Sequence, residues 1–125
     1  MENIAITLPQ KLWDKVVAGE KVVELRKRFP RRFDSELSRC YVVGKGTSMV
    51  LGALSLSFEQ VENTDENRRL VQKGAGVPLA WIERYYAGHL YMHLWYIIHF
   101  GDFRDWDVDI SVLGLARVPE SFVYL

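Results

Sequence analysis

Three ionisable side chains of mixed sign, Lys21, Glu24 and Arg26, lie within six residues of sequence and are the group best suited to chemistry. On a strand, Glu24 and Arg26 would share a face with their side chains about 7 Å apart. A lysine beside an arginine is less stable as a cation, so the Lys21 amine could act as a base or a nucleophile. Glu24 is the alternative base, held in place by Arg26. The other interpretation is a surface ion-pair triplet, which would contribute little to stability.

A basic segment with aromatic residues inside it follows directly, and its cations are Arg26, Lys27, Arg28, Arg31 and Arg32. Clustered guanidinium groups suit bidentate contacts with phosphate, and Phe29 or Phe33 could stack on a base. The alternative is a solvated basic edge strand, which its charges protect from pairing. The whole chain has 16 basic and 16 acidic residues, so binding to a polyanion must come from this segment rather than from net charge.

The three histidines, His89, His93 and His99, are the residues that could indicate a metal site. The composition of this segment favours a strand, on which His89 and His93 would be about 13 Å apart. That separation is too large for one zinc ion, whose nitrogen ligands lie about 2.0–2.1 Å away. Cys40 is the only cysteine, which excludes a disulfide within the chain and a site of several thiolates. The sequence therefore predicts neither a metal site nor a cofactor.

Length and composition predict one globular domain spanning residues 1–125. The chain is 49% hydrophobic and 26% charged, as soluble globular proteins are. Its first residues do not have the pattern of a secretory signal, and the longest apolar stretch, 94–100, is too short to span a bilayer. We expect a cytoplasmic protein that does not associate with a membrane. The sequence indicates no particular protein partner.

The residues around the ionisable group predict a helix followed by a strand. Pro9 suits the first turn of a helix whose apolar face includes Trp13 and Val16, and Gly19 suits its end. A period of two predicts a strand over 22–28. Other predicted elements are strands at 4–6, 40–43, 49–61, 89–100 and 110–116, a helix at 78–87, a loop or solvated helix at 63–73, and an extended tail at 118–122. This mixed order predicts an α+β domain, and such long strands in a short chain favour a curled or closed sheet.

Tryptophan and glycine positions indicate where the chain packs closely. The four tryptophans, Trp13, Trp81, Trp95 and Trp106, are expected in the core or on the wall of a cleft. Trp95 shares a strand face with the histidines, so it could stack on a base if that face lines a cleft. Gly52, inside a predicted strand, indicates a bulge or a close approach of another segment.

The combination of Gly19, Lys21, Glu24 and Arg26 forms a G-x-K-x-x-E-x-R motif that resembles the hallmark of the ASCH domain family, which has a PUA-like fold. The flanking segments are similar as well. A Leu-Trp-x-x-Val-Val helix precedes the motif, and the Ser-Met-Val-Leu-Gly-Ala-Leu-Ser-Leu segment looks like a barrel strand of the family. Further similar features are the helix at 81–88, the strand at 91–99 and the terminal segment at 119–122. The resemblance implies a small mixed β-barrel flanked by two or three helices, with a cleft lined by the motif.

The resemblance implies binding of RNA or of a nucleotide or nucleoside. Glu24 would then orient Arg26 or accept a hydrogen bond from a base, and the phosphate-gripping residues would be Lys21, Arg26, Arg28, Arg31 and Arg32. A protein-interaction domain, in which the charged motif only stabilises the barrel, is a further interpretation.

The second function that the resemblance implies is a small hydrolase acting on RNA or a modified nucleoside. Lys21 or Glu24 would be the base or nucleophile, and an arginine would hold the developing anion. One branch of the family looks like an acetylcytidine amidohydrolase, which keeps the lysine but has threonine in place of Glu24. Another relative resembles a ribonuclease that uses lysine, tyrosine and serine, for which Lys21, Tyr91 and Ser121 are the candidates here.

Overall fold

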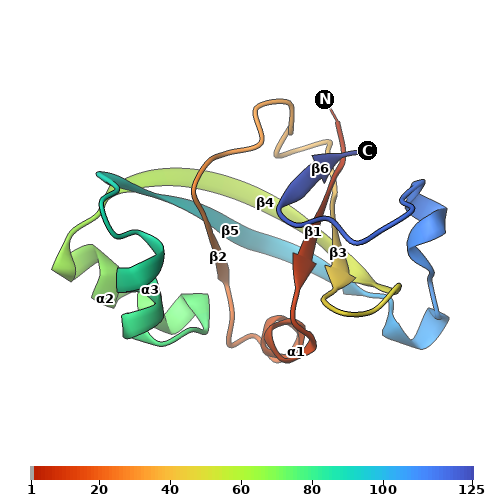
Figure 1. Ribbon diagram of the computed structural model, residues 1–125, viewed down its shortest axis with the longest axis horizontal. Coiled ribbons are helices and arrows are strands. Elements are labelled where there is room, and N and C mark those ends of the chain that lie inside the picture. The colour runs from red at the N-terminus through yellow and green to blue at the C-terminus, as the bar shows by residue number, and fades with distance from the viewer. Residues whose placement is uncertain (1) are drawn as a thin grey trace.

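Six strands form one mixed, curled sheet in the computed structural model, which describes residues 2–125 (Figure 1). The elements in chain order are β1 (Ile4–Leu8), α1 (Gln10–Val17), β2 (Val23–Arg26), β3 (Cys40–Gly44), β4 (Val50–Glu62), α2 (Asp65–Ala75), α3 (Leu79–Tyr85), β5 (Tyr91–Asp102), two short 3-10 helices (Arg104–Trp106 and Ile110–Leu113) and β6 (Phe122–Tyr124). The strand order is β2-β5-β4-β3-β1-β6. Strands β1 and β3 are parallel and the other pairs are antiparallel. The predicted α+β class is confirmed, as a curled half-barrel with three helices.

The long strands β4 and β5 lie at the centre of this sheet and curve across the molecule in Figure 1. They pair along most of their length, with β2 added to β5 on one side and β3, β1 and β6 added to β4 on the other. Twist and register shifts, one of them between Ser55 and Leu56, curl such a sheet. The edge strand β2 is linked to β1 by the Arg26 guanidinium, which donates to the Thr7 carbonyl at 3.3 Å.

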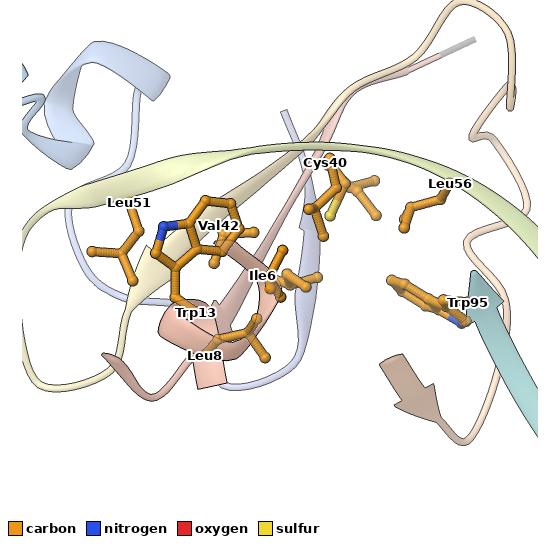
Figure 2. Packing of buried hydrophobic residues seen from close by; sticks show 11 residues of the cluster. Ile6, Leu8, Trp13, Cys40, Val42, Leu51, Leu56 and Trp95 are labelled. Atoms are coloured by element: carbon orange, nitrogen blue, oxygen red, sulfur yellow. The ribbon is translucent and has the colours of Figure 1, made fainter. Parts of the chain in front are cut away.

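Two hydrophobic clusters take side chains from opposite faces of β5. On one face Trp13 of α1 packs near Leu51 and Val42, and Trp95 lies near Leu56 (Figure 2). On the other face α2 and α3 cover a second cluster, formed by Val23, Leu25, Ala75, Ile82, Tyr86, Met92 and Leu94. Because side chains alternate along a strand, this arrangement leaves Glu24 and Arg26 on the same side as Trp95.

The predicted strand at 110–116 is wrong. Ile110–Leu113 is a 3-10 helix, because the Asp109 side chain accepts a hydrogen bond from the Ser111 amide and so favours a turn over a strand. The last strand is instead β6, which pairs with β1. It begins at Phe122, the last residue of the predicted extended tail, and continues to Tyr124. The segment 63–73, predicted as a loop or solvated helix, forms most of α2, which continues to Ala75. No helix within residues 2–125 is long and apolar enough to cross a membrane.

Candidate functional site

The turn between α1 and β2 fixes the position of the motif. Gly19 has φ of 77°, a left-handed conformation that glycine adopts without steric cost, so the chain leaves the helix sharply. The amides of Glu20 and Lys21 both donate to the Lys15 carbonyl, at 2.9 and 3.0 Å. Strand β2 begins at Val23, two residues after the lysine. The Lys21 side chain is thereby directed into the protein beneath the end of α2.

Lys21 is a buried ammonium with a full set of acceptors. It is 2% exposed, and its Nζ donates to the carbonyls of Val23 at 2.8 Å and Ala75 at 2.7 Å. The third contact is an ion pair with Glu24 Oε1 at 3.1 Å. An ammonium carries three hydrogens, so these three contacts use all of them. The sequence-based interpretation as a surface ion-pair triplet is wrong, because Glu24 is also only 7% exposed.

Glu24 bridges the two cations of the motif. Its Oε2 accepts hydrogen bonds from both Arg26 Nε at 3.0 Å and Arg26 Nη2 at 2.6 Å, so one oxygen serves two donors. Burial alone would raise the pKa of Glu24, but the attraction of Lys21 and Arg26 and their hydrogen bonds outweigh burial and hold this pKa below its ordinary value. The carboxyl group is therefore an ionised acceptor at neutral pH.

A cavity of about 370 Å³, here called the motif cavity, lies over this network. Lys21, Glu24 and Arg26 form its floor. One wall is aromatic, since the rings of Trp81 and Tyr85 from α3 stack with centroids 4.6 Å apart and planes 17° apart. Its other lining includes apolar Leu12 and Val77 and the polar residues Thr7, Lys45, Glu120 and Ser121. The cavity thus combines a charged floor with a flat apolar wall.

A second hollow of about 740 Å³, here called the basic cleft, is lined by Arg28, Phe29, Arg31, Arg32, His93, Phe122 and Tyr124. The Arg28 guanidinium lies 4.9 Å from the centroid of the Phe122 ring, and the Arg32 guanidinium lies 3.9 Å from that of Tyr124. Arg32 also pairs with Glu2 at 3.0 Å, whereas Arg28 and Arg31 have no acidic partner among residues 2–125.

Both hollows lie between the edge strands. The motif cavity takes residues from β2 and from the segment before β6, and the basic cleft takes residues from the segment after β2 and from β6 itself. Burial, reinforced by the neighbouring His89, lowers the pKa of His93, which favours its neutral form in the basic cleft. The positive charge of this cleft therefore comes from its arginines.

Three crystal structures have the same arrangement of elements. The ASCH protein from Zymomonas mobilis matches with a TM-score of 0.75 and 16% sequence identity, over 99% of this chain and 87% of that one. A serine-to-alanine mutant of that protein matches at 0.71 with 15% identity over 99% and 88% of the two chains, and a tyrosine-to-phenylalanine mutant matches at 0.70 with 17% identity over 100% and 91%. This chain has the ASCH fold. No family model and no curated protein matches the sequence, so the similarity is carried by the structure.

The ASCH fold separates the sequence-predicted site residues into two groups. Lys21, Glu24 and Arg26 form the floor of the motif cavity and Ser121 lines it, while Arg28, Arg31 and Arg32 line the basic cleft. Tyr91 lines neither hollow, because it stands opposite Glu62 at the start of β5, two residues beyond the end of β2.

The prediction that Trp95 could stack on a base is wrong. Trp95 is 0% exposed, donates through Nε1 to the Arg28 carbonyl at 3.2 Å, and packs edge-on against Phe58 and Phe122. Strand β5 lies inside the sheet, so core residues fill this face. The aromatic side chains that line the motif cavity are Trp81 and Tyr85. Their spacing of four residues, which places two side chains on one helix face, is the sequence signal that indicates such a wall.

Proposed function

We propose that this ASCH-fold protein binds RNA or a nucleotide, with a base in the motif cavity and phosphate groups at the basic cleft. The observation that carries the proposal is the pair of guanidiniums without an acidic partner among residues 2–125, Arg28 and Arg31, in a cleft that follows the motif cavity along β2. A phosphate would supply the missing negative charge, and guanidinium groups bind phosphate oxygens in bidentate fashion.

The aromatic wall of the motif cavity supports placing a base there. The volume of about 370 Å³ lies within the usual range of small-molecule sites. Stacking of a base on an aromatic side chain contributes about 1–3 kcal/mol. Lys27 lies with its Nζ 4.7 Å from the Tyr85 ring centroid, so a cation is already present at the edge of this wall. A nucleotide would meet both a stacking surface and positive charge.

The basic cleft supports placing phosphate at its arginines rather than at Lys21. The guanidiniums of Arg28 and Arg32 lie over the rings of Phe122 and Tyr124, and such cation–π contacts favour orientations that are ready to bind an anion. Lys21 has no hydrogen left to donate to a ligand. We therefore assign it the role of supporting the cavity floor.

The hydrolase alternative is less well supported by the same contacts. The Lys21 ammonium would have to lose a proton and give up a contact with a carbonyl or with Glu24 before its nitrogen could act as a base. Glu24 is a weak base because its pKa lies below the ordinary value, whereas an efficient general base has a pKa near the working pH. Ser121 is the remaining candidate nucleophile in the cavity. The interpretation of the motif as a stabiliser of the barrel is compatible with binding, because the network that ties β2 to α2 also forms the floor.

Binding of a labelled single-stranded RNA, measured by fluorescence anisotropy as salt is raised, tests the proposal. We expect the logarithm of the affinity to fall linearly with the logarithm of the salt concentration, because phosphate contacts release counterions. The Tyr85→Ala variant should weaken binding about tenfold through lost stacking. Tyr91→Ala is the matched control, since Tyr91 is an exposed tyrosine outside both hollows. An RNA affinity that does not change with salt would contradict the proposal.

A further inference from the structure

We propose that the floor of the motif cavity selects an unpaired base through one acceptor on Glu24 and one donor nitrogen on Arg26. The proposal rests on the function proposed above and adds the class of base edge that the site recognises. That edge carries an N–H donor beside an acceptor. A base whose amino group has lost both hydrogens would be rejected.

The donor side follows from the contacts of Arg26. A guanidinium has five N–H hydrogens. Nε donates to Glu24, and Nη2 donates to Glu24 and to the Thr7 carbonyl. Nη1 has no protein acceptor among residues 2–125, and the Arg26 side chain remains 14% exposed while lining the cavity. Two hydrogens of Arg26 are therefore available to a ligand.

The acceptor side follows from the contacts of Glu24. An ionised carboxylate has about four acceptor sites and no donor. Arg26 occupies two of them on Oε2, and Lys21 occupies one on Oε1. One site on Oε1 remains, and the side chain is 9% exposed at the cavity. Because the flanking cations keep this group ionised, it cannot become a donor at neutral pH.

One acceptor and one donor nitrogen are complementary in hydrogen-bonding character to the pairing edge of a base. In adenine and cytosine an amino N–H lies beside a ring-nitrogen acceptor, and proteins read such edges in single-stranded RNA by hydrogen bonds combined with aromatic stacking. The amino group would donate to Glu24 and the ring nitrogen would accept from Arg26, with the ring plane against Trp81 or Tyr85. In a duplex the same edge is already paired. The site is therefore specific for unpaired bases.

A ligand without the N–H would leave the Glu24 acceptor desolvated and unpartnered. Losing one partner of a buried hydrogen bond to a charged group weakens binding about 10- to 100-fold. A steric explanation predicts something different, because a single added methyl group would then weaken binding as well. Comparing bases that carry one methyl group on the amino nitrogen with bases that carry two separates loss of the hydrogen bond from steric exclusion.

The experiment uses short single-stranded RNA homopolymers with the unaltered protein. One series contains adenine, N6-methyladenine or N6,N6-dimethyladenine at every position, and a second contains the corresponding N4-methylated cytosines. The series whose unmodified member binds more tightly is the informative one. We expect the monomethylated polymer to bind within about threefold of the unmodified one and the dimethylated polymer to bind 10- to 100-fold more weakly. The unmodified strand annealed to its complement should also bind at least about tenfold more weakly than when single.

The outcomes separate this proposal from the function on which it rests. If one methyl group weakened binding as much as two, the limit would be steric and the proposal would be overturned. Equal affinity for all three polymers, or for single strand and duplex, would also overturn it, while salt-dependent binding of the unmodified RNA would leave the proposed function standing. If neither unmodified polymer binds, both proposals fail.

Discussion

The Lys21 ammonium and the Glu24 carboxylate form a 3.1 Å ion pair that is almost completely removed from water. The carbonyl of Ala75, 54 residues further along the chain, accepts a second hydrogen bond from the same ammonium. The pair therefore joins the start of β2 to the end of α2 and supports the cavity floor. Intact buried ion pairs contribute little net stability, but removing one partner leaves a buried charge without compensation.

Replacing Lys21 by methionine should destabilise the protein strongly. The Lys21→Met variant leaves Glu24 with Arg26 alone and two buried carbonyls without a donor, so we expect the free energy of unfolding to fall by about 3–5 kcal/mol. Urea denaturation measures this change. Lys11→Met, at an exposed position of α1, is the control and should stay within about 0.5 kcal/mol of the unaltered protein. A Lys21→Met protein of unchanged stability would show that the network does not support the fold.

Glu24 should make the stability of the protein sensitive to acid. Its pKa is lower in the folded protein than the ordinary value of 4.5, so the folded state binds fewer protons than the unfolded chain in this range. The stabilisation is fully present above pH 4.5 and is lost as the pH falls through the folded-state pKa. The measurement is the free energy of unfolding as a function of pH. In Glu24→Gln the slope below pH 4.5 should be shallower than in the unaltered protein, whereas Glu83→Gln, at an exposed site on α3, should retain it.

The basic cleft should determine how strongly RNA binding depends on salt. Each phosphate contact on a single strand contributes about 0.7 to the slope of log affinity against log salt. We expect Arg28→Ala and Arg31→Ala each to reduce the slope by about this amount, and the double variant to reduce it by about twice as much. Arg69→Ala removes an exposed arginine on α2, outside the cleft, and is the matched control. If Arg28→Ala, Arg31→Ala and the double variant all had the same slope as Arg69→Ala, the phosphates would lie elsewhere.

The parts of the site that sequence reasoning predicted depend on neighbouring residues. Gly19 indicated the end of α1, and the alternation at 22–28 separated Val23 and Leu25 from Glu24 and Arg26, as the structure confirms. Backbone conformation and strand period are local properties, so a short window of sequence contains them.

The parts that were missed depend on distant segments. The burial of Lys21 requires the carbonyl of Ala75 from the end of α2. Strand alternation placed Trp95 on the histidine face, but whether this face is open depends on core residues from β1, β3 and α1 that fill it. Trp106, expected in the core or on a cleft wall, is 73% exposed and stacks on Phe103. In each case the sequence around the residue did not reveal whether a distant segment covers its side chain.

Gly52 should not tolerate a side chain, which tests the close approach predicted from the sequence. A Cβ atom there would lie 2.1 Å from the Gly101 carbonyl oxygen and 2.3 Å from a ring carbon of Trp13. Neither neighbour can rotate away, because one is backbone and the other is fully buried, with its Nε1 donating to Asp102 at 3.1 Å. We expect Gly52→Ala to lower the free energy of unfolding by about 1–3 kcal/mol through overpacking. Urea denaturation measures this change. The control is Ser57→Ala, on the same strand, which should change the free energy of unfolding by less than about 0.5 kcal/mol. An equally small effect of Gly52→Ala would mean that α1 and β5 do not approach β4 this closely.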